Sequence, residues 1–273
     1  MEVVKAHGTG NDFVVIDDLT GSIEISAAQV RAICDRHFGI GADGVIRIAR
    51  GTSAPFFMDY RNADGSLAEM CGNGVRVVGK YLGDRGLCGT EVDLETRAGV
   101  KRLLLHAGDD GCVDRVTVDM GAPEVDQANM LEPIEVDGFV YEPARVSMGN
   151  PHAVLFVDDV DKAPVTTLGP AVEIHPAFPN KTNVEFVQVL DEGHIRQRTW
   201  ERGVGETLAC GTGACAVAVA SQLRGVAGER VTVQLRGGRL ELQWTPGGTV
   251  RMTGPAEEVA HGTIGPVLLA ATD

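Results

Sequence analysis

The sequence predicts a mixed α/β (α+β) fold of two similar halves, each a curled, mostly antiparallel or mixed β-sheet around one central helix. Two observations support this prediction. Segments typical of strands outnumber segments typical of helices, which favours a curled sheet over a doubly wound one. In addition, a cysteine followed by a Gly-polar-Gly turn and an apolar, helical segment occurs twice, at Cys71 and Cys210.

A constant spacing relates the two halves. Residues 71 and 210 are 139 positions apart, as are residues 11 and 150, and residues 44 and 183. Because three landmarks share one spacing, we infer two structurally similar domains that meet across a pseudo-two-fold axis. We place the domain boundary near residues 118–124, with a first domain at 1–118 and a second from 119. Each domain is expected to present its cysteine to a shared cleft.

The first half contains seven expected strands and two expected helices. Ser26 is a suitable N-cap for a helix that runs to about residue 36, and Gly83 is expected to end the helix after Cys71. The expected strands are 3–7, 12–17, 45–49, 55–60, 91–97, 100–106 and 113–120.

The second half repeats this order. Helices are expected at 166–174 and in the apolar segment 214–223 after Cys210. The expected strands are 146–148, 153–157, 183–190, 194–200, 230–235, 239–244 and 249–252.

Composition limits the function classes. The 273 residues carry a formal net charge of −14 and no basic run, so nucleic acid is not an expected partner. No apolar run approaches the ~18 residues of a membrane span, and the start lacks the pattern of a signal peptide. The six cysteines form no CxxC pair, so we expect reduced thiols, a cytoplasmic location and no metal.

The chemistry is expected at the two helix starts. Free N–H groups at a helix N-terminus can lower a thiol pKa and can bind a carboxylate. Neither turn has the third glycine of a dinucleotide-binding motif. The remaining cysteines are expected to be small, buried or partly buried apolar residues: Cys34, Cys88, Cys112 and Cys215.

Two matched thiols suit the inversion of a tetrahedral carbon. One base removes a proton from one face while an acid delivers a proton to the other, and the roles swap in the reverse direction. Because two nearby thiolates repel each other, the pair is expected to hold one proton between them. The helix N-termini could stabilise negative charge that develops on a substrate carboxylate.

These residues resemble the diaminopimelate epimerase family, a group of pyridoxal-independent, two-cysteine amino-acid epimerases. The similarity covers essentially the full chain. It lies in the segment 62–76 around Cys71, the segment 8–13, the segment 149–152, Asn183, and the segments Glu201-Arg202 and 210–213.

The resemblance implies epimerisation of L,L-2,6-diaminopimelate to the meso isomer in lysine and peptidoglycan-precursor biosynthesis, without a cofactor. It implies that Cys71 and Cys210 form the acid and base pair, assisted by His152 and Glu201. A second domain would end at residue 258, and the tail 259–273 would pack on the first domain. A homodimer remains open. The implied substrate-binding residues are Asn11, Asn62, Gly72, Asn73, Asn150, Asn183, Glu201, Arg202, Gly211 and Thr212.

One position departs from the family pattern. Many members carry Gln at the position of Gly44, and a glycine has no side chain to contribute to binding. Gly44 is therefore left out of the expected site.

Three alternatives stay open. Proline racemase-like and hydroxyproline epimerase-like enzymes share opposed cysteines, but they usually carry His where this chain has Asn73. A ligand-binding protein would need the carboxylate clamp but neither thiol. A thiol redox protein fits poorly, because Cys71 and Cys210 are not a CxxC pair.

Overall fold

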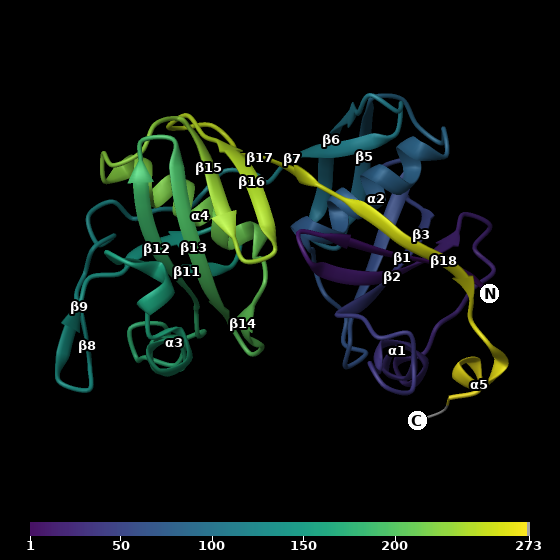
Figure 1. Ribbon diagram of the computed structural model, residues 1–273, viewed down its shortest axis with the longest axis horizontal. Coiled ribbons are helices and arrows are strands. Elements are labelled where there is room, and N and C mark those ends of the chain that lie inside the picture. Colours follow the sequence, from purple (N-terminus) through teal and green to yellow (C-terminus); the bar gives the residue numbers. More distant parts are fainter. Residues whose placement is uncertain (272–273) are drawn as a thin grey trace. The chain divides into compact units, whose positions relative to one another are not determined.

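The computed structural model describes residues 1–271, and the chain forms two compact units (Figure 1). The first unit comprises Met1–Val118 together with the segment that begins at Gly254. The second unit comprises Asp119–Thr253.

The first unit is a mixed sheet with two longer helices. Its strands follow the order β7-β6-β5-β4-β3-β2-β1-β18. The β2/β3 and β4/β5 pairs are parallel, whereas the other neighbours for which a register is defined are antiparallel. The elements are β1 (Glu2–Gly8), β2 (Asn11–Asp18), α1 (Ala27–Cys34), β3 (Gly44–Arg50), β4 (Phe56–Asn62), α2 (Gly72–Asp84), β5 (Glu91–Thr96), β6 (Gly99–Ala107), β7 (Val113–Asp119), β18 (Glu257–Thr263) and α5 (Pro266–Leu269).

The second unit has the same construction. Its strands follow the order β10-β11-β12-β13-β15-β16-β17, with β14 paired to β13, and the β11/β12 and β13/β15 pairs are parallel. The elements are β8 (Ile134–Val136), β9 (Phe139–Tyr141), β10 (Ala144–Ser147), β11 (Pro151–Phe156), η1 (Val160–Lys162), α3 (Val165–Glu173), β12 (Asn183–Asp191), β13 (His194–Glu201), β14 (Gly205–Thr207), α4 (Gly211–Leu223), β15 (Arg230–Leu235), β16 (Gly238–Gln243) and β17 (Arg251–Pro255).

The sequence repeat is confirmed as a structural repeat. Helices α2 and α4 both have 13 residues, and their bounds differ by the spacing that separates Cys71 from Cys210. Strand registers follow the same rule: Phe13 lies opposite Gly44 in the first unit, and His152 lies opposite Asn183 in the second. The expectation of two similar curled sheets is therefore correct at the level of individual residue pairs.

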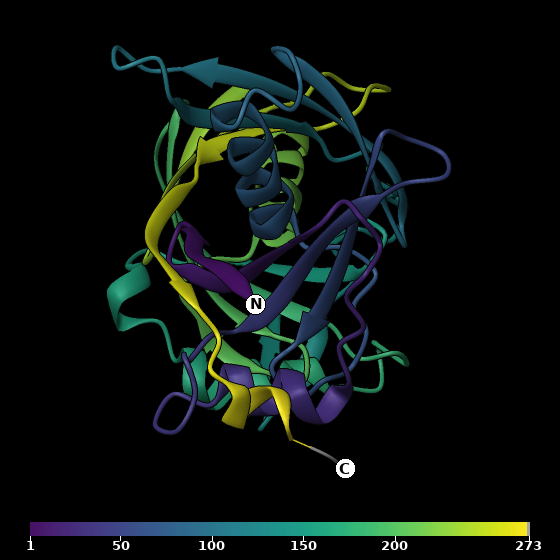
Figure 2. The ribbon, with the colours of Figure 1, turned by 90° about the vertical axis from the view of Figure 1, so that its right-hand side faces the viewer.

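Small residues allow each sheet to close around its central helix. In α2, a Cβ at Gly83 would lie 2.6 Å from Val113 Cγ2, so only glycine permits this approach. In α4, nearly every residue is buried, and many of the buried residues are alanine. Figure 2 shows α2 with strands of the first unit around it, in agreement with its contacts to β1, β2, β4 and β6.

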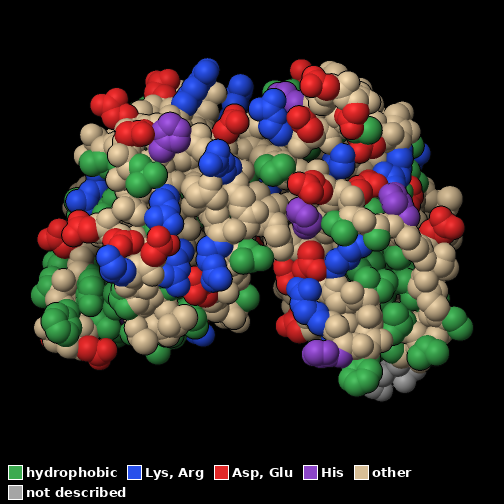
Figure 3. Space-filling view, in the orientation of Figure 1, with side chains coloured by type: hydrophobic (Ala, Val, Ile, Leu, Met, Phe, Trp, Pro, Cys, Tyr) green, Lys and Arg blue, Asp and Glu red, His purple; other side chains and the backbone are tan. Residues whose placement is uncertain are grey.

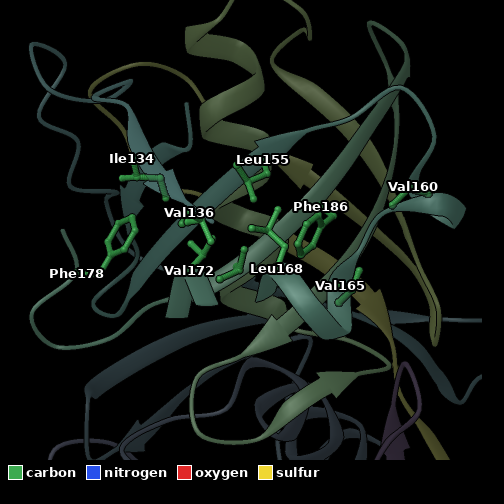
Figure 4. Packing of buried hydrophobic residues seen from close by; sticks show 11 residues of the cluster. Ile134, Val136, Leu155, Val160, Val165, Leu168, Val172, Phe178 and Phe186 are labelled. Carbon is green, nitrogen blue, oxygen red and sulfur yellow. The ribbon is translucent and has the colours of Figure 1, made fainter. Parts of the chain in front are cut away.

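The outer face of each sheet carries a second helix. Helix α1 begins at the N-cap Ser26, where the Ser26 hydroxyl and the Gln29 side chain form a reciprocal capping box. It packs Val30 and Ile33 on β2 and β3. Helix α3 occupies the matching place in the second unit, where Leu168 and Val172 pack with Phe186 of β12 (Figure 4).

Several expectations need correction. Helix α1 ends at Cys34 rather than near residue 36, because the chain leaves the helical conformation at Asp35. The β8–β9 hairpin was not expected, although its Asp137-Gly138 turn, with positive φ at both residues, is typical of such hairpins. Strand β18, which pairs with β1, was also not expected. Cys112 is exposed, since it lies in the turn before β7, whereas a buried or partly buried position was expected.

The surface fits the composition. On the face shown in Figure 3, acidic and basic side chains are interspersed, without a large basic patch. Within residues 1–271, no helix is long and apolar enough to cross a membrane.

The fold makes a first prediction about stability. Replacing Phe186 by Ala removes a fully buried ring between α3 and β12, so it should lower the free energy of unfolding of the second unit by about 3–5 kcal/mol. Denaturant unfolding measures this loss. Val204→Ala, at a side chain with 75% exposure, is the control and should change it by less than about 0.5 kcal/mol. A loss below about 1 kcal/mol for Phe186→Ala would contradict the described packing.

Candidate active site

Each cysteine is the N-cap residue of a central helix. Cys71 (φ −139°, ψ 113°) precedes α2, and Cys210 (φ −119°, ψ 112°) precedes α4. Both residues are extended, so each side chain lies beside the first turn, whose N–H groups have no partner inside the helix. Thus both helix starts combine a thiol with a potential carboxylate-binding turn.

Cys71 lies beside two side-chain amides, those of Asn11 and Asn73. We call Cys71, Gly72, Asn73 and Asn11 the first half-site. The Asn11 Oδ1 atom accepts from the Cys71 thiol (3.5 Å) and from Asn73 Nδ2 (3.1 Å). The Asn11 Nδ2 atom donates to Asp43 at 2.7 Å. Because the Asn11 amide is bonded at both ends, its oxygen is held toward Cys71.

A buried arginine supports the first half-site. The Arg76 side chain is fully buried and donates to Asn73 Oδ1 (2.9 Å), Thr9 Oγ1 (3.1 Å) and the Gly72 carbonyl (3.3 Å). These bonds fix the Asn73 amide, which in turn donates to Asn11. Arg76 was not among the expected site residues, although a basic residue within an apolar helical segment is a usable signal.

Asn62 stands apart from this group. It lies at the end of β4, and its side-chain Nδ2 donates to Ser66 Oγ at 3.0 Å rather than to the residues around Cys71. Its place in the site remains an expectation.

Cys210 belongs to a second half-site, formed by Cys210, Thr212, Asn150, His152 and Glu201. The Cys210 sulfur accepts from the Gly213 N–H (3.4 Å) and lies 3.5 Å from the Thr212 hydroxyl, which accepts from Asn150 Nδ2 at 3.3 Å. The Asn150 Oδ1 atom faces His152 Nε2 at 3.1 Å. The Cys210 side chain also hydrogen-bonds to Glu201.

The pKa of the Cys210 thiol differs in direction from the expectation. Burial raises the pKa of the Cys210 thiol well above its usual value, and the carboxylates of Glu201 and Glu185 raise it further. The Thr212 hydroxyl and the Gly213 N–H act in the opposite direction but do not offset these effects. The expected lowering by the helix N-terminus is therefore wrong for Cys210, because burial and the two carboxylates shift the pKa of the thiol in the opposite direction.

The pKa of the Glu201 carboxyl group is also raised. Burial raises the pKa of its carboxyl group, and the neighbouring Glu185 carboxylate adds to the shift. Thr207 Oγ1 donates to Glu201 Oε1 at 2.5 Å and fixes its orientation. The sequence offered no signal for Thr207, because the contact depends on the pairing of β13 with β14.

Asn183 and Arg202 form a separate pair. The Arg202 backbone N–H donates to Asn183 Oδ1 at 2.9 Å, and Asn183 Nδ2 donates to the Pro151 carbonyl at 3.0 Å. The turn is further held by Glu173, whose Oε1 accepts from the Gly203 N–H at 3.1 Å. The Arg202 side chain is exposed and donates to the Asn180 carbonyl at 3.0 Å.

The structure explains the glycine at position 44. A Cβ there would lie 2.4 Å from the Arg61 carbonyl oxygen and 2.5 Å from Tyr60 Cε2. The Tyr60 ring packs edge-on against Phe13, with 5.6 Å between ring centroids, so it cannot easily move away. A larger side chain at position 44 would require rearrangement of this pair.

Within residues 1–271, no group of three or more His, Cys, Asp or Glu side chains is arranged to hold a metal ion. The polar groups around the cysteines are instead arranged as hydrogen-bond donors and acceptors.

Solved structures with the same fold are epimerases and related proteins. A hydroxyproline epimerase from Agrobacterium vitis superposes with a TM-score of 0.72 at 18% identity, covering 96% of this chain and 91% of its own. A predicted epimerase from Pseudomonas aeruginosa gives a TM-score of 0.72 at 20% identity, covering 96% and 98%. At these identities the similarity establishes the fold.

Sequence relatives identify the class and the family. The diaminopimelate epimerase family model matches residues 3–125 and 144–259. The diaminopimelate epimerase of Leptospira biflexa is 50% identical over 272 residues, covering 95% of this chain and 97% of the relative. That of Alkalilimnicola ehrlichii is 51% identical over 276 residues, covering 95% and 97%. Fold and relatives together define the protein as an isomerase of the epimerase class. Within this class, the chain belongs to the diaminopimelate epimerase family.

A prediction follows from the charges around Cys210. Replacing Glu201 by Gln removes a carboxylate that raises the pKa of Cys210, so the thiolate fraction at pH 8 should rise about three- to tenfold. The rate of iodoacetamide alkylation at Cys210, measured by peptide mass spectrometry, reports this fraction. Glu206→Gln changes a carboxylate that is paired with Arg198 and should leave the rate unchanged. An unchanged or slower rate in Glu201→Gln would contradict the electrostatic account.

Proposed function

We propose that the protein converts L,L-2,6-diaminopimelate to meso-2,6-diaminopimelate without a cofactor, by a two-base thiol/thiolate mechanism. The observation that carries the proposal is that two matched helices begin at Cys71 and Cys210 in the same local geometry. Membership in the family and the names of the relatives support the substrate. The proposal includes a role in lysine and peptidoglycan-precursor biosynthesis.

The proposed reaction inverts one α-carbon. A thiolate removes the α-proton from one face, and the thiol of the other cysteine delivers a proton to the opposite face. The electron pair of the broken C–H bond moves onto the α-carboxylate and returns to carbon as the new C–H bond forms. The raised pKa of Cys210 supports a role as proton donor in one direction, which leaves Cys71 as the base.

The helix starts supply the proposed stabilisation. Main-chain N–H groups at Gly72 and Asn73, and at Gly211 and Thr212, would bind the carboxylate on which negative charge develops. This matters because an amino-acid α-proton is a weak acid without an electron sink. The half-site amides would exclude water and orient the carbon: Asn11 beside Cys71, and Asn150 with Thr212 beside Cys210.

The second end of the substrate would use the remaining polar residues. Arg202 suits the distal carboxylate by charge and fork geometry, and the Arg202 backbone is already held by Asn183. Asn62 would add a further hydrogen bond. His152 and Glu201 would assist proton transfer at Cys210, because Glu201 contacts the thiol and His152 is joined to it through Asn150 and Thr212.

A cyclic substrate such as hydroxyproline is the main alternative, and the fold alone is compatible with it. Asn73 and the second charged group at Arg202 favour a longer substrate with two charged ends. Incubation with L,L-diaminopimelate, proline and hydroxyproline separately, followed by chiral analysis, distinguishes the two. Inversion of a proline derivative but not of diaminopimelate would overturn the substrate assignment.

The two-base mechanism predicts the effect of removing either thiol. Cys71→Ala and Cys210→Ala should each lower the rate of inversion by about 10²–10⁴-fold, because one face loses its proton carrier. Chiral analysis of the product measures the rate. Cys112→Ala, at an exposed cysteine, is the control and should retain full activity. Near-normal inversion by either active-site variant would show that the pairing is wrong.

The proposed role of Arg202 predicts a binding defect. Arg202→Ala should raise the Michaelis constant for diaminopimelate by about tenfold or more, because a charge-assisted hydrogen bond contributes about 1.5–3 kcal/mol. Steady-state kinetics measure this change. Arg196→Ala, at an arginine of β13 paired with Asp161, is the matched control. An unchanged Michaelis constant in Arg202→Ala would remove this residue from the site.

A further inference from the structure

The structural repeat allows the two cysteine half-sites to be compared position by position. Ile46 of β3 lies opposite Tyr60 of β4, and Glu185 of β12 lies opposite Thr199 of β13. Both positions are related by the spacing that separates Cys71 from Cys210. The side chains of Ile46 and Glu185 therefore occupy the same place on their respective sheets.

These matched positions lie directly beneath the helix starts. A Cβ at Gly74 would lie 2.9 Å from Ile46 Cδ1 and 3.7 Å from Met58 Sδ. A Cβ at Gly213, the equivalent glycine of α4, would lie 2.6 Å from Glu185 Oε1 and 3.2 Å from Gln197 Nε2. The sheet side chains that face the first turn of α2 are thus apolar. Those that face the first turn of α4 are polar and include a carboxyl group.

Glu185 is unusually placed for an acidic residue. Its side chain is fully buried, and its Oε1 atom lies 2.8 Å from His152 Nδ1. Its Oε2 atom is buried and has no hydrogen-bond partner among the described residues. Burying a carboxylate with one oxygen unpaired is costly, so a purely structural role would be better served by an apolar residue such as the Ile46 of the first unit.

The His152 contact gives Glu185 a way to act on the site. His152 Nδ1 faces Glu185, and His152 Nε2 faces Asn150 Oδ1. The Asn150 Nδ2 atom is bonded to the Thr212 hydroxyl, so the amide oxygen is the atom that faces the ring. Each ring nitrogen thus faces an oxygen that can accept from it, and Glu185, through Nδ1, orients the ring toward the residues beside Cys210.

We infer that Glu185 is a positioning residue of the second half-site. Its buried carboxylate holds the His152 ring through Nδ1 and places beneath Cys210 a negative charge that has no counterpart beneath Cys71. The inference rests on the proposed function, in which the two thiols exchange the roles of acid and base. The charge of Glu185 makes the two cysteines, which occupy equivalent positions in their units, chemically unequal.

The surrounding charges agree with this role. The ionisable groups that act on Cys210 from the sheet are Glu201 of β13 and Glu185 of β12, and both raise the pKa of the thiol. Glu185 also raises the pKa of Glu201, whereas His152 of β11 lowers it. A neutral residue at position 185 would therefore release the proton of Cys210 more readily.

The test compares Glu185→Gln and Glu185→Asp with the wild-type protein. In Glu185→Gln, alkylation of Cys210 at pH 8 should become about threefold faster or more, kcat should fall while KM changes little, and the high-pH limb of the kcat profile should move to lower pH. Glu185→Asp restores the charge and should reverse these changes in part. Asp18→Asn removes another fully buried carboxylate, paired with Arg47 in the first unit, and should alter neither the alkylation rate nor the pH profile.

Two readouts separate this inference from the proposed function. Alkylation of Cys210 needs no substrate, so it reports on Glu185 even if diaminopimelate is not the substrate. In the wild-type protein, ¹⁵N NMR of His152 should show a proton on Nδ1, the nitrogen that faces Glu185, a result that does not depend on any variant folding. An unprotonated Nδ1, or a Glu185→Gln variant with wild-type alkylation rate and pH profile, would overturn the inference.

Discussion

The rest of the structure depends on the close packing of the first turn of each central helix against the side chains of its own sheet. Gly74 and Gly213 permit this approach, since a Cβ at either position would collide with a side chain of the sheet. As a result, most of the first turn of each helix is buried, with Cys71 partly buried and Cys210 buried at the N-cap positions. The thiol, the main-chain N–H groups and the neighbouring amides are thereby fixed in one small region of each unit, which is a geometry suited to proton transfer beside a bound carboxylate.

Around the two cysteines, the units share the same backbone pairing but differ in the charge of their side chains. The residues that match His152, Glu185 and Glu201 in the first unit are Phe13, Ile46 and Asn62, related by the same spacing as Cys71 and Cys210. The backbone pairing at these positions is retained, as the registers of β2–β4 and β11–β13 show. The repeat therefore preserved the positions of the thiols, while the side chains below them diverged. Burial is the main cause of the raised pKa of the Cys210 thiol, and two of the divergent residues, Glu201 and Glu185, raise it further.

Much of this could be predicted from the sequence, because spacing is a property of the sequence. The repeat, the two cysteine helices and most strands follow from periodicity and from landmarks such as Gly10-Asn11 and Gly149-Asn150. Burial could not be predicted in the same way. Arg76 and Glu185 act through tertiary contacts that no local pattern encodes, and the pKa of Cys210 depends on carboxylates from two other strands. Helix position alone gave the wrong direction for that pKa, since desolvation outweighs the N-terminal N–H groups. Strand β18 lacks apolar alternation, because most of its side chains are exposed.

The most direct test of the two-base account follows deuterium during the first turnovers of L,L-diaminopimelate in D₂O. Two thiols on opposite faces predict that the meso product carries solvent deuterium at the inverted carbon from the start, while recovered L,L substrate remains protonated at early times. Mass spectrometry of the separated isomers distinguishes these species. A single base that removes and returns the same proton predicts meso product that retains the original hydrogen, and this result would contradict the account.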